Sequence, residues 1–136
     1  MVAIEARREA WGLWVVSVAL LAVELAVPYL VPSRRDPWQG AETAVAGFVL
    51  ALLSFPAAVS TFALREQLAD AAAARVARVR FLLLALWGRC LLIGLFGCVM
   101  AYGAASPAAA WPFAAGAAVL LVLHAPRHSL LAPPAL

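Results

Sequence analysis

Four long apolar stretches, separated by short polar or proline-containing segments, dominate the pattern along the chain. A membrane-spanning helix needs roughly 20 apolar residues to cross about 30 Å of hydrocarbon. The four stretches cover about residues 11–31, 42–64, 81–103 and 108–124. The pattern therefore predicts an all-α integral membrane protein in which four transmembrane helices form a single domain over residues 1–136.

The composition agrees with this prediction, because 66% of the 136 residues are hydrophobic and only 12% are charged. A soluble domain carries about a quarter of its residues as charged side chains. The spans use most of the chain, so we expect no soluble catalytic domain. The net charge of +3 comes from ten arginines and seven acids, and it could suggest a nucleic-acid partner. The arginines, however, cluster at the ends of the spans rather than on one basic face, so we expect no nucleic-acid binding.

The distribution of arginine between the two sides of the predicted membrane indicates the orientation. One side has only Arg34 and Arg35. The other side has seven, which are Arg7, Arg8, Arg65, Arg75, Arg78, Arg80 and Arg127. Arginine-rich loops stay in the cytoplasm, so we expect both termini to be cytoplasmic. The alanine-rich, lysine-free composition is typical of a GC-rich bacterial genome, which makes the bacterial inner membrane the expected location.

The connection 65–80, "REQLADAAAARVARVR", is basic and contains neither glycine nor proline. Alanine and arginine favour helix, so the two flanking spans can continue as a helical hairpin beyond the membrane. Such a hairpin could dock a partner or anionic lipid headgroups through its arginines. Alternatively, the segment is a plain basic loop that serves only the topology. Its basic residues are Arg65, Arg75, Arg78 and Arg80.

Two of the predicted spans carry stripes of small residues at alternating spacings of three and four, which places each stripe on one helical face. Small residues let transmembrane helices approach closely, and packing of this kind drives their association in lipid. We therefore predict helix-packing seams within the chain or against another subunit. The seam residues are Ala44, Gly47, Ala51, Ser54, Ala58 and Thr61 in the second span and Cys90, Gly94, Gly97 and Ala101 in the third.

Two charged residues lie inside predicted spans. At 1.5 Å per residue, Glu24 is about 20 Å and Arg89 about 12 Å from the cytoplasmic end of its span. Burying either charge alone is costly, so they form a candidate ion pair, and Ser17 could extend a polar track on the face of Glu24. Two alternatives remain open: the charges mark a proton or ion site, or Arg89 extends toward the headgroups.

Prolines within two spans leave backbone carbonyls without their usual donor. Pro28 has no N–H to bond the carbonyl of Glu24, and Pro56 has none for Leu52. We expect Ser54, Ser60 and Thr61 to bond backbone carbonyls near Pro56. Cys90 and Cys98 are eight residues apart on one helix, about 12 Å, which is too far for a disulfide; we interpret them as small core residues.

The sequence contains no nucleophile–base constellation and no glycine-rich phosphate loop, so we expect no enzyme activity, no cofactor and no metal site. The leading hypothesis is an accessory, structural four-helix subunit of a larger bacterial inner-membrane complex, respiratory or transport machinery. Its expected partners are membrane lipid and other membrane-protein subunits, in a hetero- or homo-oligomer. The alternative is a small oligomeric transporter or channel that uses Glu24 and Arg89.

Overall fold

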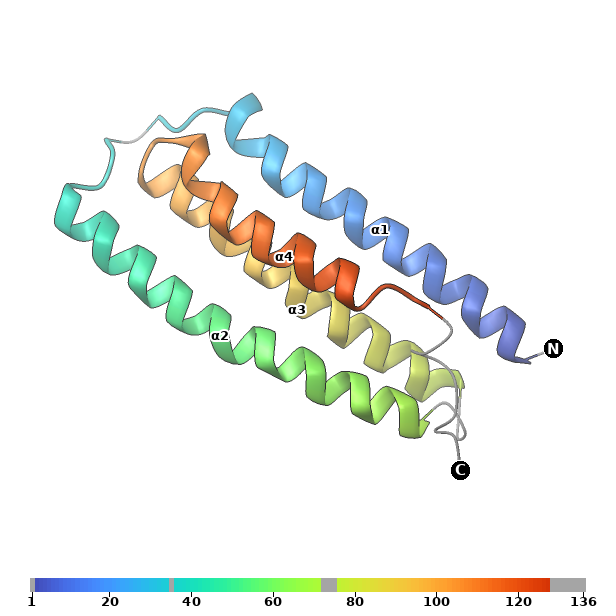
Figure 1. Ribbon diagram of the computed structural model, residues 1–136. Helices are drawn as coiled ribbons and strands as arrows, with labels where there is room; N and C mark the ends of the chain where they lie inside the picture. Colours follow the sequence, from blue (N-terminus) through green and yellow to red (C-terminus); the bar gives the residue numbers. More distant parts are fainter. Residues whose placement is uncertain (1, 35, 72–75, 128–136) are drawn as a thin grey trace.

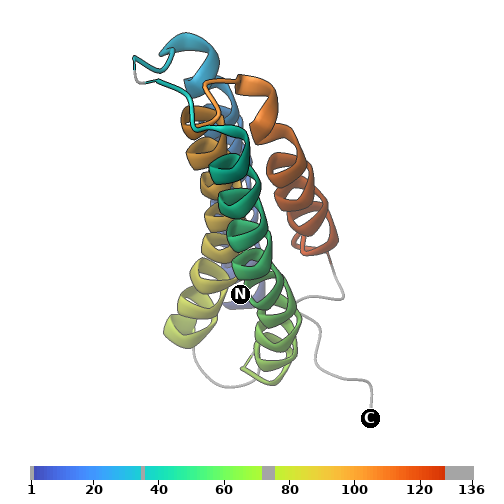
Figure 2. The same cartoon turned by 90° about the vertical axis from the view of Figure 1, so that its left-hand side faces the viewer.

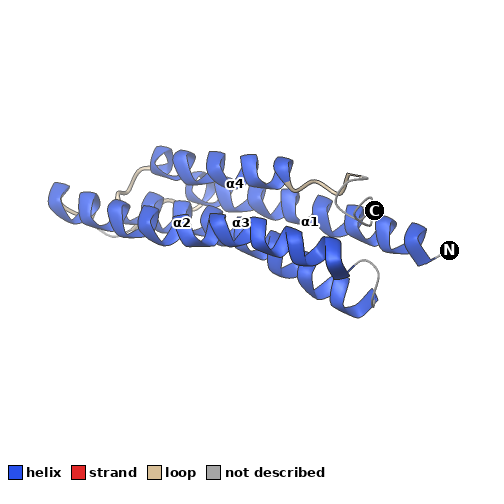
Figure 3. Ribbon diagram, turned by 60° about the horizontal axis from the view of Figure 1, so that its bottom comes forward, coloured by secondary structure: helices blue, strands red, loops and turns tan. Residues whose placement is uncertain are grey.

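The computed structural model describes residues 2–34, 36–71 and 76–127. These residues form helices and short connections, with no strand in the described ranges (Figure 3). The helices are α1 (Val2–Leu30), α2 (Gly40–Ala71), α3 (Val76–Gly103) and α4 (Trp111–Leu123), and a 3₁₀ turn, η1 (Pro107–Ala110), precedes α4. The prediction of an all-α chain is confirmed.

The helix α3 lies at the centre of the arrangement and packs against α1, α2 and α4 (Figure 1). The helix α2 packs mainly against α3, whereas α1 and α4 also contact each other. Successive helices run in opposite directions along one long axis (Figures 1 and 2). The start of α1 and the end of α4 therefore lie at the same end of the bundle.

Three helices, α1, α2 and α3, are long and apolar enough to cross a membrane. The fourth predicted span, 108–124, is divided between η1 and α4. The 13 residues of α4 extend about 20 Å at 1.5 Å per residue, which is less than the hydrocarbon thickness of about 30 Å. Pro107 and Pro112 each stand near the start of an element, where a missing N–H costs nothing. A fourth span thus stays a prediction.

The helices around the basic connection 65–80 are longer than the apolar pattern alone predicts. The helix α2 continues to Ala71 and α3 begins at Val76, so most of this segment is helical. Arg75 lies outside the described residues. The absence of glycine and proline between Pro56 and Gly88 leaves nothing in the sequence to end either helix earlier.

The best-buried core lies at the end of the bundle that carries most of the arginines, called here the arginine-rich end. Leu68, Leu83, Leu86 and Trp87 are almost fully buried there. Trp14 of α1 donates from Nε1 to the carbonyl of Leu121 over 2.9 Å. This hydrogen bond links α1 to α4 and sets their relative position along the long axis of the bundle.

The opposite end is held by contacts that join α1, α3, α4 and the connection that follows α1. Tyr102 of α3 donates its hydroxyl to the carbonyl of Val31 over 2.8 Å, and Tyr29 accepts from Nε1 of Trp111 over 2.8 Å. The backbone N–H of Trp38 donates to the carbonyl of Gly103 over 2.8 Å. The indole of Trp38 also packs so closely on Gly103 that a β-carbon there would overlap it. These contacts order the link between α1 and α2.

Candidate functional site

The carboxylate of Glu24 lies between α1 and α3, against Gly94. A β-carbon at Gly94 would overlap the Glu24 oxygen Oε2 and would lie 2.6 Å from Cδ1 of Leu21. Glycine at position 94 is therefore what allows an acidic side chain to enter this helix interface. Oε2 is buried, and none of the described residues gives it a hydrogen bond.

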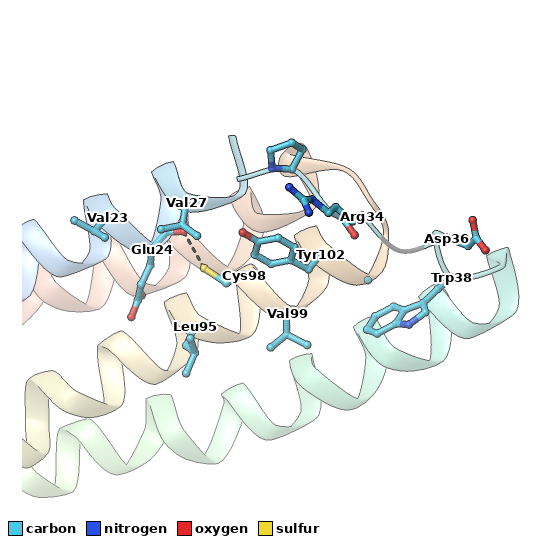
Figure 4. A pocket seen from close by; sticks show the side chains of 13 residues that line it. Val23, Glu24, Val27, Arg34, Asp36, Trp38, Leu95, Cys98, Val99 and Tyr102 are labelled. Atoms are coloured by element: carbon cyan, nitrogen blue, oxygen red, sulfur yellow. Dashed lines mark hydrogen bonds between the residues drawn. The ribbon is translucent and has the colours of Figure 1, made fainter. Parts of the chain in front are cut away.

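The backbone carbonyl of Glu24, in contrast, has a partner from the neighbouring helix. Pro28 removes the N–H that would bond this carbonyl within α1. The thiol of Cys98 on α3 donates to it over 2.8 Å (Figure 4). The sequence predicts a carbonyl without its usual donor, and the structure shows which side chain supplies one. Cys98 is half-buried rather than part of the core, and its role here is that of a hydrogen-bond donor between helices.

A cavity of about 790 Å³ opens beside Glu24. Its walls are Glu24 and apolar side chains of α1, residues of the end of α3, and the connection between α1 and α2. Figure 4 shows Glu24 toward one end of this cavity, with Arg34 and Asp36 of the connection toward the other. Called here the Glu24 cavity, it combines a buried carboxylate with an apolar wall and a charged rim.

The structure does not bring Arg89 to Glu24. Among the described residues the one ion pair joins Arg80 to Glu9, over 2.7 Å. Arg89 is five residues before Gly94, which places the two about 140° apart around α3 at 3.6 residues per turn. The candidate pair of the sequence analysis therefore does not form within this chain. A position inside two neighbouring helices is not enough for contact, since the faces must also match.

Ser17 does not extend a polar track to Glu24. Its side chain is buried and its hydroxyl donates to the carbonyl of Leu13 over 2.9 Å, within α1. A serine that bonds the preceding turn satisfies its own hydroxyl and needs no partner on another helix. Glu24, Arg89 and Ser17 are therefore not in contact with one another.

The small-residue seam of α2 is only partly covered by the rest of the chain. Thr61 is fully buried, and Ala58 packs against the core. Toward the start of α2 the cover is incomplete. Gly47 still contacts Met100 of α3, with 3.3 Å between an added β-carbon and Cε. Ala44 and Ala51 are exposed. The chain itself therefore uses only part of this seam.

The small residues of α3 meet two different helices. Gly94 faces Glu24 and Leu21 of α1, whereas a β-carbon at Gly97 would lie 2.9 Å from the carbonyl oxygen of Ala110 in η1. Cys90 and Ala101 are both buried. The stripe serves two interfaces, because α1 and the η1–α4 segment both pack on this side of α3.

Hydroxyl groups on α2 bond backbone carbonyls, as predicted from their position near Pro56. Ser54 donates to Leu50 over 2.8 Å, Ser60 to Ala57 over 2.8 Å, and Thr61 to Ala58 over 2.6 Å. None of these three bonds reaches the carbonyl of Leu52, which Pro56 leaves without its usual donor.

A buried histidine that the sequence analysis did not single out lies at the end of α4. The side chain of His124 is fully buried, with Nε2 2.9 Å from the hydroxyl of Thr61 and its ring edge-on to Phe62. The Thr61 hydroxyl thus lies within hydrogen-bond distance of both Nε2 of His124 and the carbonyl of Ala58. Nδ1 has no partner among the described residues. Only the fold brings α2 and the end of α4 together here, so no local pattern could reveal the pair.

The basic side chains of the connection 65–80 lie at the arginine-rich end. Arg65 is half-buried, whereas Arg78 and Arg80 are exposed. Arg80 donates to Glu9 of α1 over 2.7 Å. An exposed pair of this kind contributes only about 0–1 kcal/mol to stability, and it joins the starts of α1 and α3.

Comparisons of the chain with protein-family models, with curated proteins and with solved structures give no match. Within residues 2–34, 36–71 and 76–127, no three His, Cys, Asp or Glu side chains form a group that could hold a metal ion.

Proposed function

We propose that this chain is an accessory, structural subunit of a larger bacterial inner-membrane complex. It binds its neighbours through the exposed small residues of the α2 seam. Both termini are proposed to face the cytoplasm, because the arginine-rich end contains the start of α1 and the end of α4. A transporter or channel that depends on joint action of Glu24 and Arg89 is less well supported, since these side chains lie on different faces.

The observation that carries this proposal is the lack of cover over α2. In the most apolar stretch of α2 only 6% of the residues are buried within the chain, whereas in the corresponding stretch of α3 the share is 50%. Exposed apolar side chains alone would suit lipid. The exposed alanines of the α2 seam are different, because small residues on one helical face favour close packing with another helix.

A groove of about 630 Å³ lies along this seam, between α2 and α4. Ala51, Ser54 and Ala58 form one wall, and Phe113 and Val119 of α4 belong to the other. Its mixture of small and large apolar side chains suits a transmembrane helix of a neighbouring subunit, which we propose as the occupant.

Ala51→Leu tests the proposal, with Ala22→Leu on the exposed side of α1 as the matched control. Tagged wild-type protein and both variants are extracted with a mild detergent, and co-purifying membrane proteins are quantified by mass spectrometry. We expect wild type and Ala22→Leu to retain the same partner in a fixed ratio. Ala51→Leu should reduce that ratio at least tenfold while the chain remains folded by circular dichroism.

Recovery of wild-type protein as a lone monomer would overturn the proposal. So would an unchanged partner ratio in the Ala51→Leu variant, because leucine in the groove must block close approach of another helix. Loss of the partner from both variants would place the interface elsewhere and would also contradict the assignment to α2.

A further inference from the structure

The Glu24 cavity has the size and composition of a small-molecule site. Its volume of about 790 Å³ falls within the roughly 300–1,000 Å³ of typical ligand pockets, which are mostly apolar with a few polar groups. Val23, Val27, Leu95 and Val99 supply the apolar wall. The carboxyl group of Glu24 lies at the inner end (Figure 4).

Two polar side chains of the cavity wall donate their hydrogen atoms away from the Glu24 carboxyl group. The Cys98 thiol donates to the backbone carbonyl of Glu24, and the Tyr102 hydroxyl donates to the carbonyl of Val31. The buried oxygen Oε2 of Glu24 receives no hydrogen bond from the described residues. Leaving such an acceptor unsatisfied is costly, so a ligand that brings its own donor would bind favourably.

Among the described residues, no cationic side chain forms an ion pair with Glu24. Arg89 lies on another face of α3, and Arg34 lies on the connection beyond α1 (Figure 4). From Glu24 to the last residue of α1, Leu30, the helix alone advances about 9 Å. A metal ion is also disfavoured, because hard cations require several oxygen ligands and a single carboxylate is present at this end.

We propose that the Glu24 cavity binds an organic ammonium ion that has an N–H donor and a compact apolar body. The ammonium group bonds the Glu24 carboxylate, and the apolar body contacts the valine and leucine wall. Trp38, which lines the cavity toward its other end (Figure 4), adds an aromatic surface there for the apolar body of the ligand. This inference does not rest on the proposed packing function of α2, because the groove of that proposal lies between α2 and α4 and not beside Glu24.

Three probes that share one apolar group test the proposal: 2-naphthylmethylammonium, its N-trimethyl analogue and 2-naphthylmethanol. Their affinities for the full chain are measured by titration calorimetry in neutral dodecyl maltoside micelles. We expect the primary ammonium to bind at least tenfold more tightly than the alcohol, with the trimethyl analogue between them. Glu24→Gln should abolish this preference, whereas Glu66→Gln, at an exposed carboxylate of α2 that does not line the cavity, should change it less than threefold.

A second variant keeps the test valid if Glu24→Gln fails to fold. Val99→Trp fills the cavity from a position that is partly exposed, and it should weaken binding of all three probes at least tenfold. Equal affinity of wild type for ammonium and alcohol would overturn the proposal. If a preference for ammonium appears only in Arg34→Gln, Arg34 neutralises Glu24 in the wild-type chain, and the proposal is also overturned.

The ammonium could belong to a free amine or to a lipid headgroup, and lipid nanodiscs distinguish the two sources. Probe binding is compared in phosphatidylcholine nanodiscs and in nanodiscs that also contain phosphatidylethanolamine. Weaker probe binding in the second set, dependent on Glu24, assigns the site to the lipid's primary ammonium. Equal binding in both sets assigns it to free amines, and either result supports the proposed chemistry.

Discussion

Replacing Gly94 by alanine measures how closely α1 and α3 approach at Glu24. In a helix interior, alanine is more stable than glycine by about 0.5–1 kcal/mol. At position 94, however, the new methyl group would overlap Oε2 of Glu24 and lie 2.6 Å from Cδ1 of Leu21. Overpacking of this kind costs about 1–3 kcal/mol. Gly88 on the same helix is the matched control, because a β-carbon there meets nothing within 4 Å.

The assay is reversible unfolding in mixed micelles, with SDS as denaturant and circular dichroism as the signal. We expect Gly88→Ala to be neutral or stabilising and Gly94→Ala to be less stable than it by about 1–3 kcal/mol. Adding Glu24→Ala to the Gly94→Ala variant should recover part of this lost stability. The part that is not recovered reflects the overlap of the new methyl group with Leu21. Equal stability of the two single variants would refute the close approach of α1 and α3 at this position.

Two further predictions concern hydrogen bonds between helices, and the same unfolding assay checks both. Cys98→Ala should lower the free energy of unfolding by about 1–3 kcal/mol relative to Cys98→Ser, because only serine can still donate to the Glu24 carbonyl. In a Pro28→Ala background the N–H returns to α1, so this difference should vanish; if it persists, Cys98 acts through packing alone. Thr61→Val should cost about 1–3 kcal/mol by leaving the buried His124 without its hydrogen-bond partner, whereas Thr61→Ser should retain most of the stability. Equal losses in both Thr61 variants would contradict this role.

The sequence by itself determined the class of the protein and much of its helical structure. Long apolar runs can satisfy backbone hydrogen bonds in lipid only as helices, so the three long helices follow from local composition. The same reasoning located a free carbonyl before Pro28, because proline always lacks an N–H. The hydroxyl bonds of Ser54, Ser60 and Thr61 are also local, since each donor and acceptor lie within one helical turn.

Only the tertiary structure decided which side chains meet. Glu24 and Arg89 have similar depths in sequence, but they are on faces of α1 and α3 that do not oppose each other. The same packing brings Cys98 to the Glu24 carbonyl and His124 to Thr61, across 74 and 63 positions of the chain. A helical sequence fixes the angle of each side chain about its own axis, but the rotation of each helix against its neighbours depends on how all the side chains fit together. For that reason the sequence could place Glu24 and Arg89 inside helices, but it could not show whether their side chains meet.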